Sequence, residues 1–143
     1  MKTDRKEMLE AVKKVMYAVP SSEKTEQNNL ILFNDSYIQS YDENMIIRSE
    51  LKTGIVGAVC AKELFALLQK MKDDKVSITK KEDYLNIKGK TTNAKLYICD
   101  VDLPEIEISD KWKGVPDNFV KGIKTCRYSL SKDINNILSN VLL

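Results

Sequence analysis

The strongest constraint on the fold is a series of short β-rich runs that are separated by only two or three polar residues. The first three runs lie at 29–33, 36–41 and 45–51, with Asn34-Asp35 and Asp42-Glu43-Asn44 between them. Breaks this short are typical of tight hairpin turns, because Asn and Asp tolerate turn conformations. Antiparallel strands accept such turns, whereas parallel strands need a much longer crossover. The sequence therefore predicts an antiparallel meander.

Two helical segments divide the β-rich runs into two similar sets. The first helix is predicted over 4–18, where Asp4 and Glu7 have the pattern of an N-cap with its partner and Pro20 ends the helix. Its apolar face comprises Met8, Leu9, Val12, Val15, Met16 and Val19, and its opposite face comprises Lys6, Glu10, Lys13, Lys14 and Tyr17. A second helix is predicted over 61–71, between a run at 55–59 and further runs at 76–79, 84–87 and 94–98. We therefore expect an α+β fold of two halves, each with one helix and about four antiparallel strands.

Composition limits the functions that the chain can have. The 143 residues include no His and three scattered Cys, so neither a Cys–His nucleophile pair nor a metal site with close Cys spacing is indicated. No apolar run approaches the roughly 20 residues of a membrane span, and the charged N-terminus lacks the apolar core of a signal peptide. A cytoplasmic location without membrane contact is therefore predicted. The formal net charge is only +2, so a nucleic-acid partner must be argued from where the charges lie.

Beyond the last β-rich run the pattern changes to an acidic segment and a third helix. The acidic segment contains Pro104, Trp112 and five carboxylates, which are Asp100, Asp102, Glu105, Glu107 and Asp110. Paired carboxylates suit a metal or acid–base site, but no second group of ligands accompanies them, so an extended acidic connector is the preferred interpretation. A helix is predicted after Pro116, with Phe119, Val120, Ile123 and Cys126 on one face and Lys121, Lys124 and Arg127 on the other.

This third helix repeats the start of the chain. When 9–32 is laid on 120–143 without a gap, Tyr17 falls on Tyr128 and the apolar positions coincide. Each copy is predicted to be a helix, a polar loop and a strand. The second copy stops after one strand without a partner, so the chain is expected to be part of a longer repeat protein. The expected organisation is a first domain over 1–107, an acidic linker over 108–115 and the beginning of a second, truncated domain over 116–143.

Several segments resemble the bacterial and phage-type DNA sliding clamp, the beta subunit of DNA polymerase III. The segment VCAKELFALLQKMKDDKVSITKKEDYLNIKGKTTNAKLYI is similar to the second half of a clamp domain, in which a helix with an LxxLLKxL pattern leads through an acidic turn into strands. The segment LEAVKKVMYAVPSSEK is in register with the first helix of the family. The segment NILSNVLL is similar to the strand that opens the next domain, although Asn136 stands where the family usually has Pro. The resemblance implies a sliding-clamp domain, with two helices packed on antiparallel sheets and an internal pseudo-twofold repeat.

The resemblance further implies a non-catalytic processivity factor without a cofactor or a metal. In the family, protomers of several such domains close into a ring around duplex DNA, tether the replicative polymerase and are opened by an ATP-dependent loader. The expected partners are therefore duplex DNA, through sequence-independent backbone contacts, a DNA polymerase, a clamp loader and further copies of the chain. The expected DNA-binding residues lie on outer helix faces and in the loops that follow them, and they are Lys6, Lys13, Lys14, Lys24, Lys121, Lys124, Arg127 and Lys132.

Two other functions stay open at this point. One is a clamp-like protein-interaction module of a replication complex that does not encircle DNA. The family's peptide groove lies between the second and third domains, and most of that region is missing from this chain. The other is an enzyme that uses Cys60 at the start of the second helix, because a helix N-terminus lowers the pKa of a thiol. The chain has no His, which is the commonest general base, and this disfavours the enzyme hypothesis.

Overall fold

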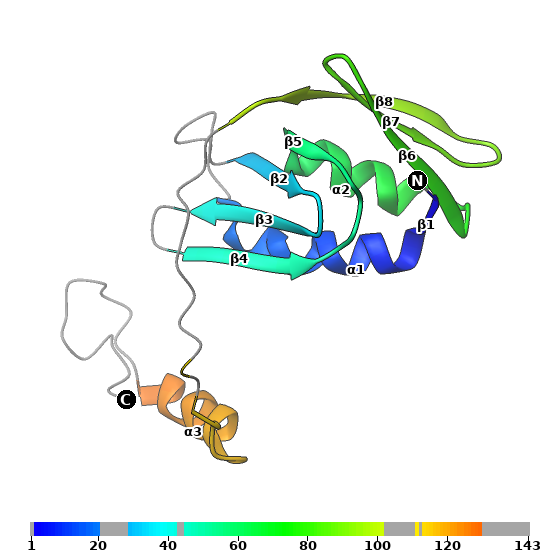
Figure 1. Ribbon diagram of the computed structural model, residues 1–143. Coiled ribbons are helices and arrows are strands. Elements are labelled where there is room, and N and C mark those ends of the chain that lie inside the picture. The colour runs from blue at the N-terminus through cyan, green and yellow to red at the C-terminus, as the bar shows by residue number, and fades with distance from the viewer. Residues whose placement is uncertain (1, 21–28, 43–44, 102–110, 112, 130–143) are drawn as a thin grey trace. The chain divides into compact units, whose positions relative to one another are not determined.

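The computed structural model describes residues 2–20, 29–42, 45–101, 111 and 113–129 (Figure 1). The chain divides into two compact units, residues 1–104 and 105–143. The predicted boundary at 107 and half of the predicted linker over 108–115 lie outside the described residues, so this part of the domain organisation stays a prediction.

The described residues of the first unit form eight strands and two α-helices. In chain order they are β1 (Lys2–Asp4), α1 (Arg5–Val15), the 3₁₀ turn η1 (Met16–Ala18), β2 (Leu30–Asn34), β3 (Tyr37–Asp42), β4 (Met45–Glu50), β5 (Val56–Cys60), α2 (Ala61–Lys70), β6 (Lys75–Lys81), β7 (Tyr84–Lys88) and β8 (Asn93–Cys99). The α+β prediction and both helices are confirmed. Strand β1 was not predicted, because a three-residue run of Lys, Thr and Asp has no apolar pattern.

All eight strands belong to one antiparallel sheet, in the order β1-β6-β7-β8-β5-β2-β3-β4. The first unit thus consists of two β-α-β-β-β halves. The first strand of each half pairs with the meander of the other: β1 pairs with β6, and β5 pairs with β2. This reciprocal exchange gives the predicted internal repeat. Strand β5, directly before α2, is the first strand of the second half.

The two four-stranded parts of the sheet, β1-β6-β7-β8 and β5-β2-β3-β4, join where β5 meets β8, through the pairs Ala58↔Cys99 and Val59↔Ile98. Gly57 permits this close approach, since its φ is +137° and a Cβ atom there would lie 2.7 Å from Ile98 Cγ1. Any other residue would combine a strained backbone with a steric overlap.

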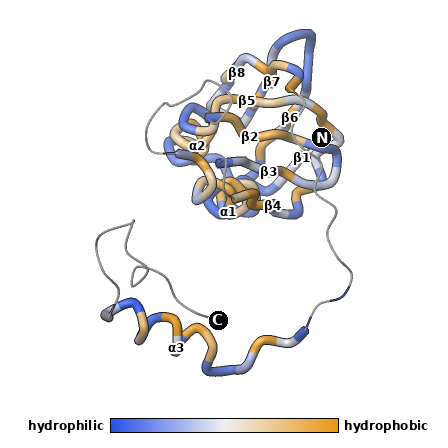
Figure 2. The backbone as a smooth tube through the Cα atoms, turned by 90° about the vertical axis from the view of Figure 1, so that its left-hand side faces the viewer, coloured by the Kyte–Doolittle hydropathy of each residue, from blue (hydrophilic) through white to orange (hydrophobic). Residues whose placement is uncertain are grey.

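Both helices cover the same face of the sheet (Figure 1). Helix α1 buries Met8, Ala11, Val12 and Val15, and α2 buries Ala61, Leu64 and Leu68. Hydrophobic residues recur at intervals along these helices and along the strands beneath them (Figure 2). The main apolar side chains that the strands add to this core are Ile31, Phe33, Ile38, Val59, Val76, Ile78, Leu85, Ile87 and Ile98. A buried hydrogen bond joins the layers, as Ser40 Oγ on β3 donates to the carbonyl oxygen of Val15 at the end of α1.

Asp73 connects the end of α2 to the turn between β7 and β8. The residue is only 9% exposed. Its Oδ1 accepts hydrogen bonds from the backbone N–H groups of Lys90 (2.8 Å) and Thr91 (3.4 Å), and its Oδ2 accepts from Thr91 Oγ1 (3.4 Å). Gly89 makes room for the carboxylate, because a Cβ there would lie 2.2 Å from Asp73 Oδ2. Burial raises the pKa of the Asp73 carboxyl, but hydrogen bonds from the Lys90 and Thr91 N–H groups and from the Thr91 and Thr92 side chains outweigh it and hold the pKa below its ordinary value of 3.8.

We predict that Asp73→Asn lowers the free energy of unfolding at neutral pH, and that the difference from wild type shrinks in acid. Because the folded-state pKa is depressed, the ionised carboxylate stabilises the fold above pH 3.8, and this contribution is lost as the pH falls through the folded-state pKa. Urea unfolding of both proteins between pH 2 and pH 7 measures it. A difference that stays constant over this range would show that the charge of Asp73 contributes nothing.

Candidate nucleic-acid interface

The solvent-facing side of α1 contains the basic residues that the sequence predicted there. Asp4 caps the helix, with its Oδ1 accepting from the N–H groups of Lys6 (2.7 Å) and Glu7 (3.3 Å). With the apolar side buried, the positions of Lys6, Glu10, Lys13, Lys14 and Tyr17 are all exposed. Lys13 and Lys14 lie in the last turn, where a positive charge interacts favourably with the helix dipole. The structure therefore brings the three predicted lysines onto one helix face, while their role in DNA binding stays a prediction.

Helix α2 presents a second exposed face, which the sequence reasoning missed. Lys62, Glu63, Ala66, Gln69 and Lys70 are exposed, opposite the buried Leu64 and Leu68. The signal was present in the sequence. Applying to 61–71 the same division into apolar and polar faces that was applied to the other helices would have nominated Lys62 and Lys70.

The exposed faces of α1 and α2 form one surface, which we call the helix face. The two helices contact each other and cover the same side of the sheet (Figure 1). The helix face contains five lysines and three glutamates, which are Lys6, Lys13, Lys14, Lys62, Lys70, Glu7, Glu10 and Glu63. Dispersed positive charge of this kind attracts phosphates without reading bases.

Arg5 differs from the neighbouring lysines because its side chain has a structural role. Its Nε donates to the carbonyl oxygen of Asp73 (2.8 Å), and its Nη1 donates to that of Leu68 (3.1 Å). The Leu68 carbonyl lies in the last turn of α2, where backbone acceptors lack partners within the helix. Arg5 therefore binds the C-terminal end of α2 to the first turn of α1, and the half-buried guanidinium is committed to the protein.

The remaining predicted residues lie in the second unit or outside the described residues. Lys121 and Lys124 are exposed on α3 (Phe119–Cys126), and Arg127 begins the 3₁₀ turn η3 (Arg127–Ser129), all in the second unit. Helix α3 begins at Phe119 rather than at Pro116, because the Phe119 N–H closes a turn on the Pro116 carbonyl (2.9 Å). Lys24 and Lys132 lie outside the described residues.

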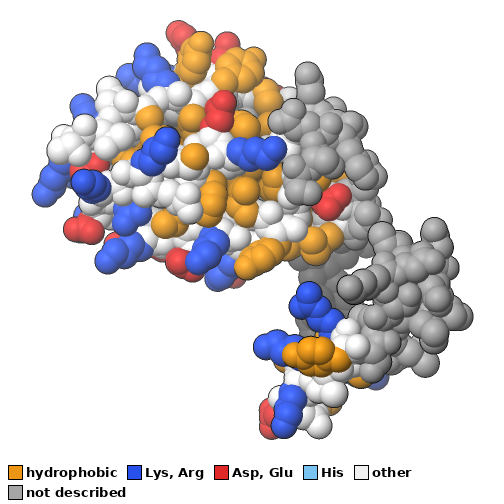
Figure 3. Space-filling view, turned by 180° about the vertical axis from the view of Figure 1, so that it is seen from behind, with side chains coloured by type: hydrophobic (Ala, Val, Ile, Leu, Met, Phe, Trp, Pro, Cys, Tyr) orange, Lys and Arg blue, Asp and Glu red, His pale blue; other side chains and the backbone are white. Residues whose placement is uncertain are grey.

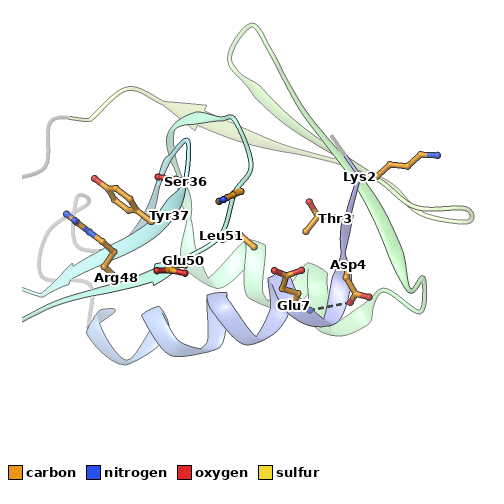
Figure 4. A pocket seen from close by; sticks show the side chains of 10 residues that line it. Lys2, Thr3, Asp4, Glu7, Ser36, Tyr37, Arg48, Glu50 and Leu51 are labelled. Carbon is orange, nitrogen blue, oxygen red and sulfur yellow. Dashed lines mark hydrogen bonds between the residues drawn. The ribbon is translucent and has the colours of Figure 1, made fainter. Parts of the chain in front are cut away.

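A cleft of about 650 Å³ lies beside the helix face, between the first turn of α1 and the end of β4 (Figure 4). The charged residues that line it are three basic ones, Lys2, Arg48 and Lys52, and three acidic ones, Asp4, Glu7 and Glu50. Arg48 is already engaged, since its guanidinium carbon lies 4.0 Å from the centre of the Tyr37 ring and its Nε and Nη2 donate to Gln39 Oε1. This balance gives the cleft no preference for a polyanion.

The described residues give little support to a thiol enzyme, a carboxylate or metal site, or a membrane span. Cys60 lies half-buried at the N-cap of α2 and makes no side-chain capping bond. Of the predicted acidic connector, Asp100 is described, and its Oδ1 pairs with Lys80 Nζ at 3.2 Å. Among the described residues, no group of three His, Cys, Asp or Glu side chains is placed to hold a metal ion. None of the described helices is long and apolar enough to cross a membrane.

Solved structures provide the comparison that decides the fold. A putative DNA polymerase III beta subunit from Eubacterium rectale superposes with a TM-score of 0.80 at 17% sequence identity, over 94% of this chain and 40% of that one. The Helicobacter pylori beta clamp bound to a DNA ligase peptide gives 0.81 at 15% identity, over 95% and 42%. The beta subunit from Thermotoga maritima gives 0.71 at 14% identity, over 92% and 40%. The chain has the fold of a DNA sliding clamp.

The sliding-clamp resemblance read from the sequence is thus confirmed at the level of the fold. No protein-family model and no curated protein matches the sequence. The chain spans about two fifths of the length of the clamp structures it matches, 40% and 42% for the first two. Ring formation and DNA binding therefore belong to the proposal below.

We predict that Arg5→Met destabilises this clamp-fold unit, whereas Lys6→Met does not. Arg5→Met leaves two carbonyl oxygens without their charged donor, which costs about 2 kcal/mol of unfolding free energy. Lys6 is exposed, and a surface substitution there changes stability by less than about 0.5 kcal/mol. Chemical denaturation of the three proteins checks the contrast, and equal stability of the two variants would contradict the structural role of Arg5.

Proposed function

We propose that this chain is part of a DNA sliding clamp, a processivity factor that surrounds duplex DNA and holds a replicative polymerase on it. The fold match to bacterial beta clamps, at TM-scores of 0.80 and 0.81, is the observation on which the proposal rests. The charge pattern of the helix face supports it. A ring that slides needs attraction to the phosphate backbone without base contacts, and dispersed lysines supply that attraction.

Encirclement requires more than one clamp unit, and the sheet offers a means of assembly. Strands β1 and β4 are the two edges of the sheet, so each leaves one row of backbone N–H and C=O groups without a strand partner in the described residues. Such an edge accepts a further strand. Of the two, β4 is longer, with six residues against three. We propose that β4 is the edge through which units of the ring join.

The protein partners follow from the same role. A clamp acts by holding a polymerase, and it needs a loader to place it on DNA, so both are proposed for the full-length protein. The Helicobacter pylori beta clamp, which is similar in fold, is bound to a DNA ligase peptide. A clamp-like interaction module that binds such peptides without encircling DNA is therefore the second candidate function. Stable retention on closed circular duplex, with release after linearisation, supports the clamp, whereas peptide binding without retention supports the module.

The helix face should determine affinity for duplex DNA. We predict that the double variant Lys13→Ala/Lys14→Ala binds duplex DNA more weakly than wild type. Its slope of log K against log salt concentration should also be less steep by up to about 1.8, because each lost phosphate contact contributes about 0.9 to that slope. Fluorescence anisotropy with a labelled duplex between 50 and 200 mM salt measures both quantities.

The matched control for this measurement is Lys88→Ala/Lys95→Ala, which removes the same charge from the face of the sheet that the helices do not cover. Duplex binding by the control should stay within about twofold of wild type. Equal losses in both double variants would mean that total charge, and not the helix face, governs binding.

Self-association through β4 is expected to depend on concentration. Sedimentation velocity should show larger species as the protein concentration rises, and hydrogen exchange should show β4 amides becoming protected at the same concentrations, while β3 amides change little because they already have partners on both sides. A monomer at all concentrations would contradict assembly by this chain. Association without protection of β4 would place the contact elsewhere.

A further inference from the structure

The sheet face that the helices do not cover has an unusual composition over β1, β6, β7 and β8. The strand registers place alternate residues of each strand on that face, opposite the buried Val76, Ile78, Leu85, Ile87 and Ile98. We call this surface the outer face, and its side chains are Lys2, Asp4, Lys75, Ser77, Thr79, Lys81, Tyr84, Asn86, Lys88, Asn93, Lys95, Tyr97 and Cys99.

The outer face is more uniformly basic than the helix face. Lys2, Lys75, Lys81, Lys88 and Lys95 are all exposed. Among the residues that these registers place there, Asp4 is the one acid, and its carboxylate is held by the N-terminus of α1. In contrast, three glutamates interrupt the lysines of the helix face. On the side of the first unit that the space-filling view shows, Lys and Arg side chains are spread, with hydrophobic and several acidic side chains between them (Figure 3).

Two exposed tyrosines lie among these lysines. Tyr84 and Tyr97 are directly opposite in the register of β7 and β8, with ring centroids 6.2 Å apart and ring planes at 82°. Their side chains remain 46% and 62% exposed. The edge-to-face contact fixes the orientation of the rings, so each loses little conformational freedom when a flat ligand stacks on it. Fixed, exposed aromatic rings surrounded by lysines on a sheet surface are the features that proteins use to bind single-stranded nucleic acid.

We propose that the outer face of β6, β7 and β8 binds single-stranded DNA, with bases stacking on Tyr84 and Tyr97 and phosphates contacting Lys81, Lys88 and Lys95. A duplex suits this face less well, because paired bases are already stacked and do not expose their faces to the tyrosines. The choice of DNA over RNA rests on the proposed clamp function, whereas the preference for a single strand rests on the tyrosine pair and the lysines.

A purely structural role for the tyrosine pair makes a different prediction. A cross-strand aromatic pair stabilises a hairpin whether or not anything binds to it. Removing the rings would then lower the thermal stability and leave DNA affinity unchanged once the protein is folded. Binding must therefore be measured on variants whose folding is verified at the assay temperature.

The test uses the full chain and a labelled dT20 oligonucleotide in 50 mM salt, read by fluorescence anisotropy. We expect Tyr84→Ala/Tyr97→Ala to weaken binding about tenfold or more, because each base–aromatic stack contributes about 1–3 kcal/mol. Tyr84→Phe/Tyr97→Phe keeps the rings and should bind within about twofold of wild type. Lys88→Ala/Lys95→Ala should reduce the salt slope by about 1.4, at about 0.7 per phosphate contact on a single strand.

The controls separate this proposal from the duplex proposal. Tyr17→Ala removes a tyrosine of η1, directly after α1, that is more exposed (76%) than either outer-face tyrosine. Lys13→Ala/Lys14→Ala removes two helix-face lysines. Both variants should leave dT20 binding unchanged. No binding of dT20 by the wild type, or equal losses with Tyr17→Ala, would overturn the proposal without affecting the duplex measurement. Binding of U20 as tight as that of dT20 would overturn the assignment to DNA. Loss of duplex binding in the helix-face variant with dT20 binding intact supports both proposals independently.

Discussion

Burial of two helices on the same face of one antiparallel sheet is the constraint on which the other features of this structure depend. Each helix has a single apolar side, and packing it against the sheet leaves a polar side in water. The opposite face of the sheet receives neither α1 nor α2, so its strands must alternate between buried and exposed side chains. In β7, for example, Leu85 and Ile87 are buried while Tyr84 and Lys88 are exposed. One-sided packing therefore produces two solvent surfaces of different chemistry from one layer of strands.

The reciprocal exchange of first strands explains why the two halves form one unit. Strand β1 begins the first half but pairs with β6 of the second, and Arg5, the residue directly after β1, donates its backbone N–H to the Asp74 carbonyl directly before β6 (2.9 Å). This pairing places the first turn of α1 beside the last turn of α2, where the Arg5 side chain reaches the Leu68 carbonyl. Asp73 extends the junction to the β7–β8 turn. Without the second half β1 would have no strand partner, and without the first half the C-terminal end of α2 would lose the hydrogen bonds from Arg5.

The sequence was sufficient to predict elements whose signals are local, and insufficient where partners lie far apart in the chain. The β2–β3–β4 meander was predictable, because its turns are marked by Asn34-Asp35 and Asp42-Glu43-Asn44, and α1 was marked by Asp4 and by its apolar period. Strand β1 was not, because only its pairing with β6 makes it a strand. The lysines of α1 were predictable as an exposed face, yet the same pattern does not distinguish Arg5, whose partners are 63 and 68 residues away. The Tyr84–Tyr97 contact likewise depends on the register of β7 and β8, which alternation alone does not specify.

The low sequence identity to the clamps, 14% to 17% among the three structures described, is consistent with how this fold is specified. Apolar periodicity, short turns and a few capping groups determine the layers, and core side chains of similar volume exchange without loss of the fold. A surface that attracts a phosphate backbone is equally tolerant, because a lysine acts from several neighbouring positions of an exposed helix. Neither the core nor the helix face therefore requires particular residues at particular positions. Function in such a chain is better inferred from the distribution of charge and aromatic rings over its two surfaces than from the identity of single residues. By that criterion the outer face, where lysines surround a fixed tyrosine pair, is as specific a feature of this molecule as the helix face.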